Sequence, residues 1–213
     1  DAEKLATSIS HEFPSHNFSW KILGAVFKAT GRNSEAINAN QTAVALSPLD
    51  AEAHSNLGIT LQELGRLDEA RASCTQAIAL KPDYAEAYYN LANTLQELGR
   101  LEEAEASYTE AITLKPYLAE PYSNLGNTLK ELGRLEEAEA SYTQAITVKP
   151  DYAEAHYNLG TTLQELGRLD EAEASYIQAI AFKPDYALAY SNLGALLQEL
   201  GRLDEAEARL TQA

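Results

Sequence analysis

Prolines recur along this chain at a fixed spacing of 34 residues. The series contains Pro14, Pro48, Pro82, Pro116, Pro150 and Pro184. Glycines and arginines keep the same step, as in the pair Gly65 and Arg66. A period of this length is typical of chains built from stacked copies of one supersecondary unit, which bury their apolar faces only against neighbouring copies. The spacing therefore predicts a repeat protein with a quasi-linear architecture.

The repeats are framed from residue 17. This gives full repeats at 17–50, 51–84, 85–118, 119–152 and 153–186, a truncated repeat at 187–213 and a partial repeat at 1–16. The apolar pattern of each repeat predicts two helices of about 14 residues, each roughly 21 Å long. In 51–84 the apolar residues recur at helical spacing, Gly65 ends the first helix and Pro82 ends the second. We expect thirteen helices in a single solenoid over residues 1–213.

Acidic residues near the start of two first helices have the spacing of a capping box. Asp83 precedes Glu86 by three residues, and Asp151 precedes Glu154 by the same interval. In a capping box the first side chain accepts from the backbone at the helix start. The spacing predicts Asp83 and Asp151 as helix caps.

The small and bulky positions of each unit resemble the tetratricopeptide repeat. Repeat 119–152 carries the full pattern, with Tyr122, Leu125, Gly126, Leu129, Ala138, Tyr142, Ala145 and Pro150. The departures are Ala92 in the glycine slot and Asn40 and Cys74 in the aromatic slot of the second helix. The resemblance implies an all-α, right-handed superhelical solenoid of antiparallel helix pairs. It also implies that the first helices line a concave groove and the second helices form the convex back.

The charge balance excludes several classes of partner. The formal net charge is −16 and the isoelectric point is near 4.6. Nucleic-acid binding needs a basic surface, and so does docking on an anionic membrane, so neither partner is expected. No apolar run is long enough for a membrane span and no signal peptide opens the chain. The cytoplasm is the default expectation for its location.

No catalytic or metal-binding motif stands out in the sequence. Neither a glycine-lysine phosphate loop nor a paired-histidine zinc motif is present. His54 and His156 occupy the bulky slot of the first helix, three repeats apart, and are expected to pack rather than to share a metal. Cys74 is expected to be a buried core thiol. We expect a non-enzymatic protein without metal or cofactor.

The sixth position of the first helix carries an asparagine in five successive repeats. These residues are Asn56, Asn90, Asn124, Asn158 and Asn192. A carboxamide offers both donors and an acceptor, so a row of them could hold an extended peptide by its backbone. The row resembles the asparagine ladder in the repeat array of O-linked N-acetylglucosamine transferase, which binds substrate peptides. The alternative is that the amides only form hydrogen bonds between repeats.

Neighbouring positions complete the candidate peptide-binding groove. They are Tyr89, Tyr157, Asn93, Asn127, Glu86, Glu120 and Glu154. Tyrosines offer apolar area with a polar tip, which suits peptide recognition, although Tyr89 and Tyr157 could instead shield the groove floor. The glutamates indicate a neutral or basic partner segment.

The leading interpretation is a protein–protein interaction scaffold that binds an extended peptide in its groove. One alternative is the substrate-presenting arm of a transferase-type enzyme, because the absence of methionine indicates a piece of a longer protein. Another is a self-assembling array that stacks through its ends, where Leu210 and Ala213 close a half-built helix.

Overall fold

The computed structural model describes residues 2–211, without the side chains of residues 2, 3, 10, 11 and 210. The described residues form thirteen α-helices and no strand, which confirms the all-α repeat prediction. Contacts divide the chain into two compact units, residues 1–115 and 116–213, each described by itself below. The stacking surface was predicted at the side chain of Leu210 and at Ala213, and both lie outside the described part of the chain.

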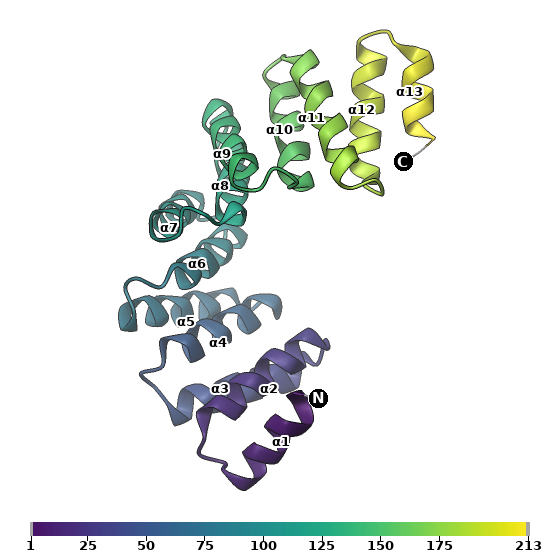
Figure 1. The fold of residues 1–213 in the computed structure, drawn as a ribbon. Coiled ribbons are helices and arrows are strands. Elements are labelled where there is room, and N and C mark those ends of the chain that lie inside the picture. The colour runs from purple at the N-terminus through teal and green to yellow at the C-terminus, as the bar shows by residue number, and fades with distance from the viewer. Residues whose placement is uncertain (1, 212–213) are drawn as a thin grey trace. The chain divides into compact units, whose positions relative to one another are not determined.

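Seven helices make up the first unit, and six make up the second (Figure 1). Unit 1 contains α1 (Ala2–Glu12), α2 (Asn17–Ala29), α3 (Asn33–Leu46), α4 (Ala51–Glu63), α5 (Leu67–Leu80), α6 (Ala85–Glu97) and α7 (Leu101–Leu114). Unit 2 contains α8 (Ala119–Glu131), α9 (Leu135–Val148), α10 (Ala153–Glu165), α11 (Leu169–Phe182), α12 (Ala187–Glu199) and α13 (Leu203–Leu210).

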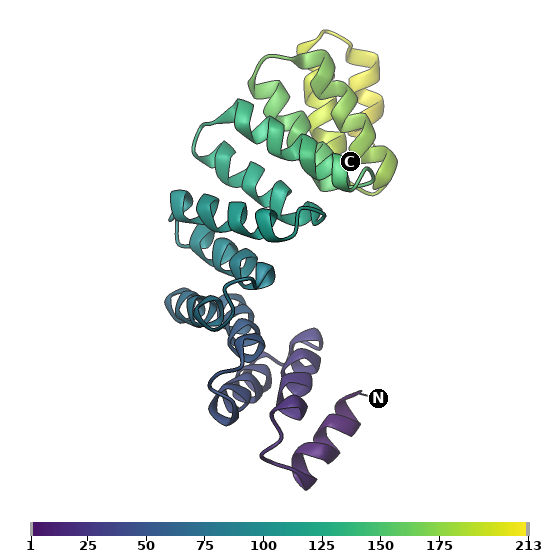
Figure 2. The same cartoon turned by 60° about the vertical axis from the view of Figure 1, so that its left-hand side comes forward.

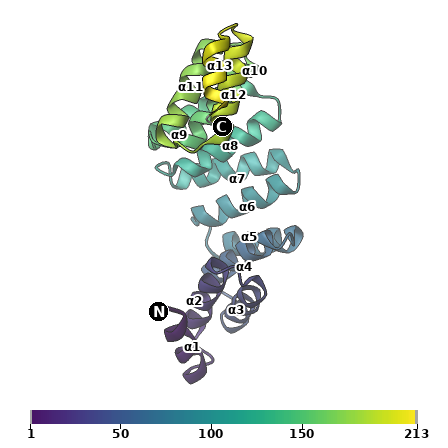
Figure 3. The ribbon, with the colours of Figure 1, turned by 90° about the vertical axis from the view of Figure 1, so that its right-hand side faces the viewer.

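Within each repeat the two helices pack side by side, as α6 and α7 do in Figure 3. Successive pairs then follow one another in chain order inside each unit (Figure 2). The first helices of neighbouring repeats also contact one another, α2 with α4, α4 with α6 and α8 with α10. In the part of the chain that is described, the second helices do not pack on one another to that extent. The first helices therefore form the inner side of each unit.

Glycine ends the first helix of each repeat in a left-handed conformation. At Gly65 φ is +71°, the Gly65 N–H donates to the Gln62 carbonyl at 2.8 Å and the Arg66 N–H donates to the Leu61 carbonyl at 2.9 Å. These two bonds form a Schellman motif, which satisfies carbonyls that the helix end leaves unpaired. The repeated glycine thus acts as the predicted helix stop.

Replacing Gly65 by alanine should lower the free energy of unfolding by about 1–2 kcal/mol, the cost of a left-handed conformation for a residue with a Cβ. No atom lies within 4 Å of the site of that Cβ, so the effect is purely conformational. Gly65→Asn should cost less, because asparagine adopts this region more readily. Urea unfolding followed by circular dichroism measures both variants. Equal loss in the two would contradict the explanation.

The predicted capping boxes are wrong by one residue. Helix α6 begins at Ala85 with Tyr84 as its N-cap, and α10 begins at Ala153 with Tyr152 as its N-cap, so Asp83 and Asp151 lie in the preceding turns. Neither tyrosine makes a side-chain capping bond. An aspartate does occupy the N-cap position of α4, the first helix of repeat 51–84. There Asp50 accepts from the Glu52 and Ala53 N–H groups at 3.0 and 3.2 Å.

Alanines and one aromatic ring fill the space between paired helices. Ala138, Tyr142 and Ala145 are completely buried in repeat 119–152. The small residues let the helix backbones approach closely, and the tyrosine fills the remaining space against Gly126. Cys74 takes the place of this ring in repeat 51–84, where it is also fully buried. This packing holds the first helices in place and so positions the candidate site.

Candidate functional site

The predicted asparagines lie on the first helices of each unit, on what we call the first-helix face of that unit. It carries Asn56 on α4 and Asn90 on α6 in unit 1, and Asn124 on α8, Asn158 on α10 and Asn192 on α12 in unit 2. In unit 1 the Asn90 side chain is 8% exposed and its Nδ2 donates to the Ser55 hydroxyl of the preceding repeat at 3.0 Å. One amide hydrogen of Asn90 thus bridges α6 to α4.

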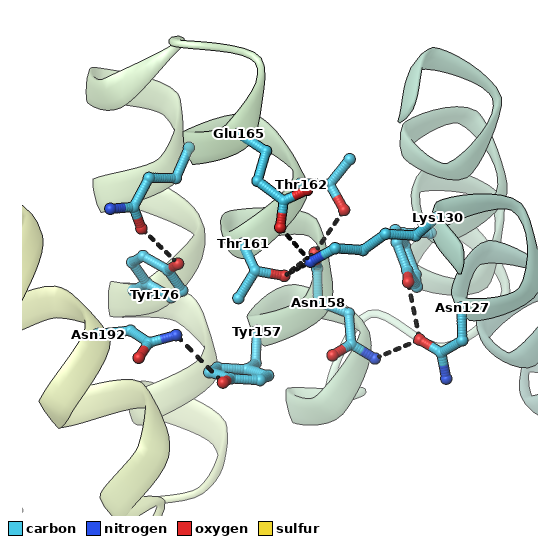
Figure 4. A network of polar contacts seen from close by, with 11 residues as sticks. Asn127, Lys130, Tyr157, Asn158, Thr161, Thr162, Glu165, Tyr176 and Asn192 are labelled. Carbon is cyan, nitrogen blue, oxygen red and sulfur yellow. Dashed lines mark hydrogen bonds and ion pairs between the residues drawn. The ribbon is translucent and has the colours of Figure 1, made fainter. Parts of the chain in front are cut away.

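The same link between repeats occurs twice in unit 2 (Figure 4). Asn158 Nδ2 donates to Asn127 Oδ1 at 3.0 Å, and Asn192 Nδ2 donates to the Tyr157 hydroxyl at 3.1 Å. Each bond joins a first helix to the first helix before it. Hydrogen bonding between repeats, the alternative left open by the sequence, is therefore present at Asn90, Asn158 and Asn192. Contact with a ligand stays a prediction.

Asn93 and Asn127 accept hydrogen bonds from the core tyrosines. The Tyr108 hydroxyl donates to Asn93 Oδ1 at 2.6 Å, and the Tyr142 hydroxyl donates to Asn127 Oδ1 at 2.7 Å. Asn127 Oδ1 thus receives two donors, one from the core and one from Asn158. These bonds connect the polar groups of the first-helix face to the interior.

Tyr89 and Tyr157 are half-buried and rest on other rings. The ring centre of Tyr89 lies 6.1 Å from that of Tyr108. Tyr157 lies 6.0 Å from Tyr176 and 5.0 Å from Tyr186. Both tyrosines therefore pack on neighbouring rings, and their half-exposed rings still offer apolar area beside the asparagines. Their contact with a ligand stays a prediction.

The glutamates predicted to select a basic partner already have counter-ions in two repeats. Glu86 forms an ion pair with Lys115, and Glu154 pairs with Lys183 at 3.0 Å. The hydrogen bond from Lys183 lowers the pKa of Glu154. Glu120 is exposed, and no residue of the described part forms an ion pair with it. The face is therefore less acidic than the sequence indicates.

A second row of links between repeats was not predicted from the sequence. It joins Lys28 to Glu63 at 3.0 Å, Gln62 to Glu97 at 2.6 Å and Lys130 to Glu165 at 2.8 Å. Lys130 also donates to the Thr161 hydroxyl at 3.0 Å (Figure 4). The sequence does contain a signal for these links: one repeat position holds lysine or glutamine, and a fixed position of the next repeat holds glutamate. These pairs border the asparagine row.

The other polar groups singled out in the sequence serve packing. His54 Nε2 is 2.9 Å from the Pro48 carbonyl, and His156 Nε2 is 2.9 Å from the Pro150 carbonyl. Burial raises the pKa of the Cys74 thiol to about 12, which keeps it protonated and unreactive. None of the described helices has the length and apolarity needed to cross a membrane.

Several solved structures are similar to this chain. MamA shares 25% identity with a TM-score of 0.70, covering 78% of this chain and 96% of MamA. TTC0263, a TPR protein of Thermus thermophilus, shares 26% identity with a TM-score of 0.68, covering 85% and 99%. YrrB, described as a TPR protein with an unusual peptide-binding site, shares 21% identity with a TM-score of 0.67, covering 86% and 95%. Comparison with curated proteins gives no match.

Family models match the repeats directly. The model described as TPR repeat matches residues 24–65, 126–167 and 163–201, and the model described as tetratricopeptide repeat matches residues 49–116. These segments include most of the helix pairs, together with the glycine turns and the buried alanines described above. The chain therefore belongs to the tetratricopeptide repeat family, whose repeats support a role as a protein-interaction scaffold.

Proposed function

We propose that this protein is a non-catalytic scaffold that binds extended segments of a protein partner along the first-helix face of a unit. In unit 1 the main chain of such a segment would contact the side-chain amide of Asn90, and in unit 2 it would contact the amides of Asn124 and Asn158. The observation that carries the proposal is the incomplete use of the Asn158 amide. Asn158 uses one of its two N–H donors within the protein, and no described residue donates to its Oδ1. A donor and an acceptor thus remain, the pair that a peptide unit requires.

The surroundings of the asparagines favour a segment with no strong negative charge. The protein's net charge is −16, and Glu120 has no ion-pair partner among the described residues. Glu86 and Glu154 are neutralised by their lysines, so a basic segment is not required. A neutral or basic segment fits this face. The peptide-binding site named for the structurally similar YrrB supports a peptide as the ligand class.

The test begins with a library of random peptides selected on the immobilised protein. Peptides enriched over the bare support are then measured by calorimetry with the wild type and with the triple variant Asn90→Ala, Asn124→Ala and Asn158→Ala. The loss of two hydrogen bonds in unit 2, of about 0.5–1.5 kcal/mol each, should weaken binding there about ten-fold, and the loss of one in unit 1 should weaken binding there by a smaller factor. Unchanged affinity of every selected peptide, or no enrichment at all, would contradict the proposal.

A matched control separates binding from repeat stability. Ser55→Ala removes the partner of Asn90 but leaves the Asn90 amide in place. It should reproduce any structural loosening between α4 and α6 and lose only the pre-ordering of the Asn90 amide, so it should weaken binding less than Asn90→Ala does. If Ser55→Ala weakens binding as much as Asn90→Ala alone, the asparagine acts only through the link between repeats.

A further inference from the structure

Unit 1 contains a pocket on the first-helix face that the sequence analysis did not identify. Its volume is about 320 Å³. The lining comes from α2, α3 and α4, with Gly24, Ala25, Lys28, Ala29, Asn40, Asn56, Ile59 and Thr60. The pocket lies beside Asn56, the first member of the asparagine row. It is therefore in reach of any segment that runs along this face.

Three short side chains in repeat 17–50 create the pocket. Ala25 lies in the slot that holds Ile59, Asn93, Asn127 and Thr161 in the next four repeats, and the last repeat again has an alanine there, Ala195. Ala29 lies in the slot that holds Glu63, Glu97, Glu131 and Glu165. Asn40 replaces the tyrosine that fills the space between paired helices at Tyr108, Tyr142 and Tyr176. Because all three substitutions fall in one repeat, they leave an opening there.

The buried Asn40 amide forms part of the pocket lining. Asn40 is 3% exposed, and its Nδ2 donates to the Thr60 hydroxyl at 2.8 Å. Its Oδ1 lies against Gly24, where a Cβ would overlap it, and finds no hydrogen-bond donor among the described residues. The Asn40 oxygen is thus turned toward Gly24. The amide is smaller than the tyrosine ring of later repeats, so it leaves space that is lined mainly by apolar atoms.

The charges at the pocket indicate a neutral occupant. Lys28 is the only charged residue of the lining, and its ammonium pairs with Glu63 at 3.0 Å. The remaining surface comes largely from Ala25, Ala29 and Ile59. A charged side chain would lose water here without gaining an ion partner, whereas an apolar side chain would match the uncharged walls. The volume is at the lower end of the roughly 300–1,000 Å³ of ligand pockets, which suits one side chain.

We propose that this pocket anchors a single apolar side chain, of leucine to phenylalanine size, from the bound partner segment. The Asn56 amide at its edge would hold the segment's main chain next to the anchored residue. This inference rests on the proposed function for the identity of the ligand as a protein segment. The pocket itself can be tested without any partner.

The test is a titration of the ¹⁵N-labelled protein with capped amino acids, followed by NMR. N-acetyl-leucinamide and N-acetyl-phenylalaninamide should shift the backbone amide signals of Ala25, Ala29 and Ile59 at millimolar concentration. N-acetyl-alaninamide and N-acetyl-lysinamide should bind about ten-fold more weakly, because they bury less apolar surface or carry an unpaired charge. Shifts elsewhere, or equal binding of the lysine compound, would overturn the proposal.

Two substitutions should fill the pocket, and each introduces a residue that another repeat already carries at the same position. Ala25→Asn and Ala29→Glu place in repeat 17–50 the residues found in the same slots at Asn93 and Glu63. Both alanines are exposed, so the fold should persist while probe binding falls about ten-fold. Ala195→Asn makes the matching change in an exposed slot of repeat 187–213 and should leave binding unchanged. Retained probe binding in the filled variants would also overturn the proposal.

The two proposals fail in different ways. None of Asn90, Asn124 and Asn158 lines the pocket, so their triple alanine variant should bind the capped amino acids normally. If the probes bind and no peptide is enriched, the pocket exists and the peptide scaffold is wrong. If peptides bind through the asparagines but the probes do not, only the anchor pocket is wrong.

Discussion

Tyr142→Ala should lower the free energy of unfolding by about 3–5 kcal/mol, the usual cost of deleting a large buried ring. Tyr142 has no exposed surface, and its Cε1 lies 2.6 Å from where a Gly126 Cβ would be. The ring therefore fills the whole space between α8 and α9 at this point. Removing it leaves a cavity and also takes one donor from Asn127.

Two variants separate the contributions of the ring and its hydroxyl. Tyr142→Phe keeps the ring and loses one hydrogen bond, so it should cost about 1 kcal/mol. Thr143→Ala changes an exposed neighbour on α9 and should stay within about 0.5 kcal/mol of the wild type. Urea unfolding by circular dichroism measures all three. A loss below about 1 kcal/mol for Tyr142→Ala would show that the helices close over the cavity.

Leu163→Ala should be nearly as damaging, with a loss of about 2–5 kcal/mol. Leu163 is 3% exposed and belongs to a buried cluster in unit 2 with Tyr176, Leu193 and Leu197. The cluster joins α10, α11, α12 and α13, so its weakening affects two successive repeats. In repeat proteins each unit depends on its neighbours, and we expect the end of unit 2 to unfold first.

The same substitution at an exposed leucine is the matched control. Leu188 on α12 is 59% exposed and lies in a slot that holds glutamate in the four preceding repeats. Leu188→Ala should change the free energy of unfolding by less than about 0.5 kcal/mol. Hydrogen exchange of α12 amides gives a second readout, with faster exchange expected only for Leu163→Ala. Similar losses in both variants would contradict the assignment of the core.

The period and the glycine positions were sufficient to predict the helices. Each glycine with positive φ ends a first helix, and the thirteen described helices follow the predicted frame. Helix starts were less predictable, because Asp83 has the spacing of a cap but lies in the turn before Tyr84. A capping pattern depends on the residue at which the helix begins, and the sequence leaves that uncertain by one position.

The site was harder to predict because its bonds join residues about one repeat apart. The pairing of Glu86 with Lys115 depends on how two helices lie side by side, which no local pattern describes. The link from Asn158 to Asn127 has the same origin. The pocket above Asn40 could have been suspected from the short residues at Ala25 and Ala29. Its volume, however, arises from three helices together.

The links between repeats also affect how much entropy binding would consume. A free asparagine on a helix surface samples several rotamers, and immobilising such side chains on binding costs about 0.5–1.5 kcal/mol each. Asn90, Asn158 and Asn192 are already held by Ser55, Asn127 and Tyr157. The entropy of fixing these rotamers is therefore lost during folding, and a partner would meet amides that already have a fixed orientation. An array with the same asparagines but without these three acceptors should bind the same segment more weakly, although its exposed amide groups would be identical.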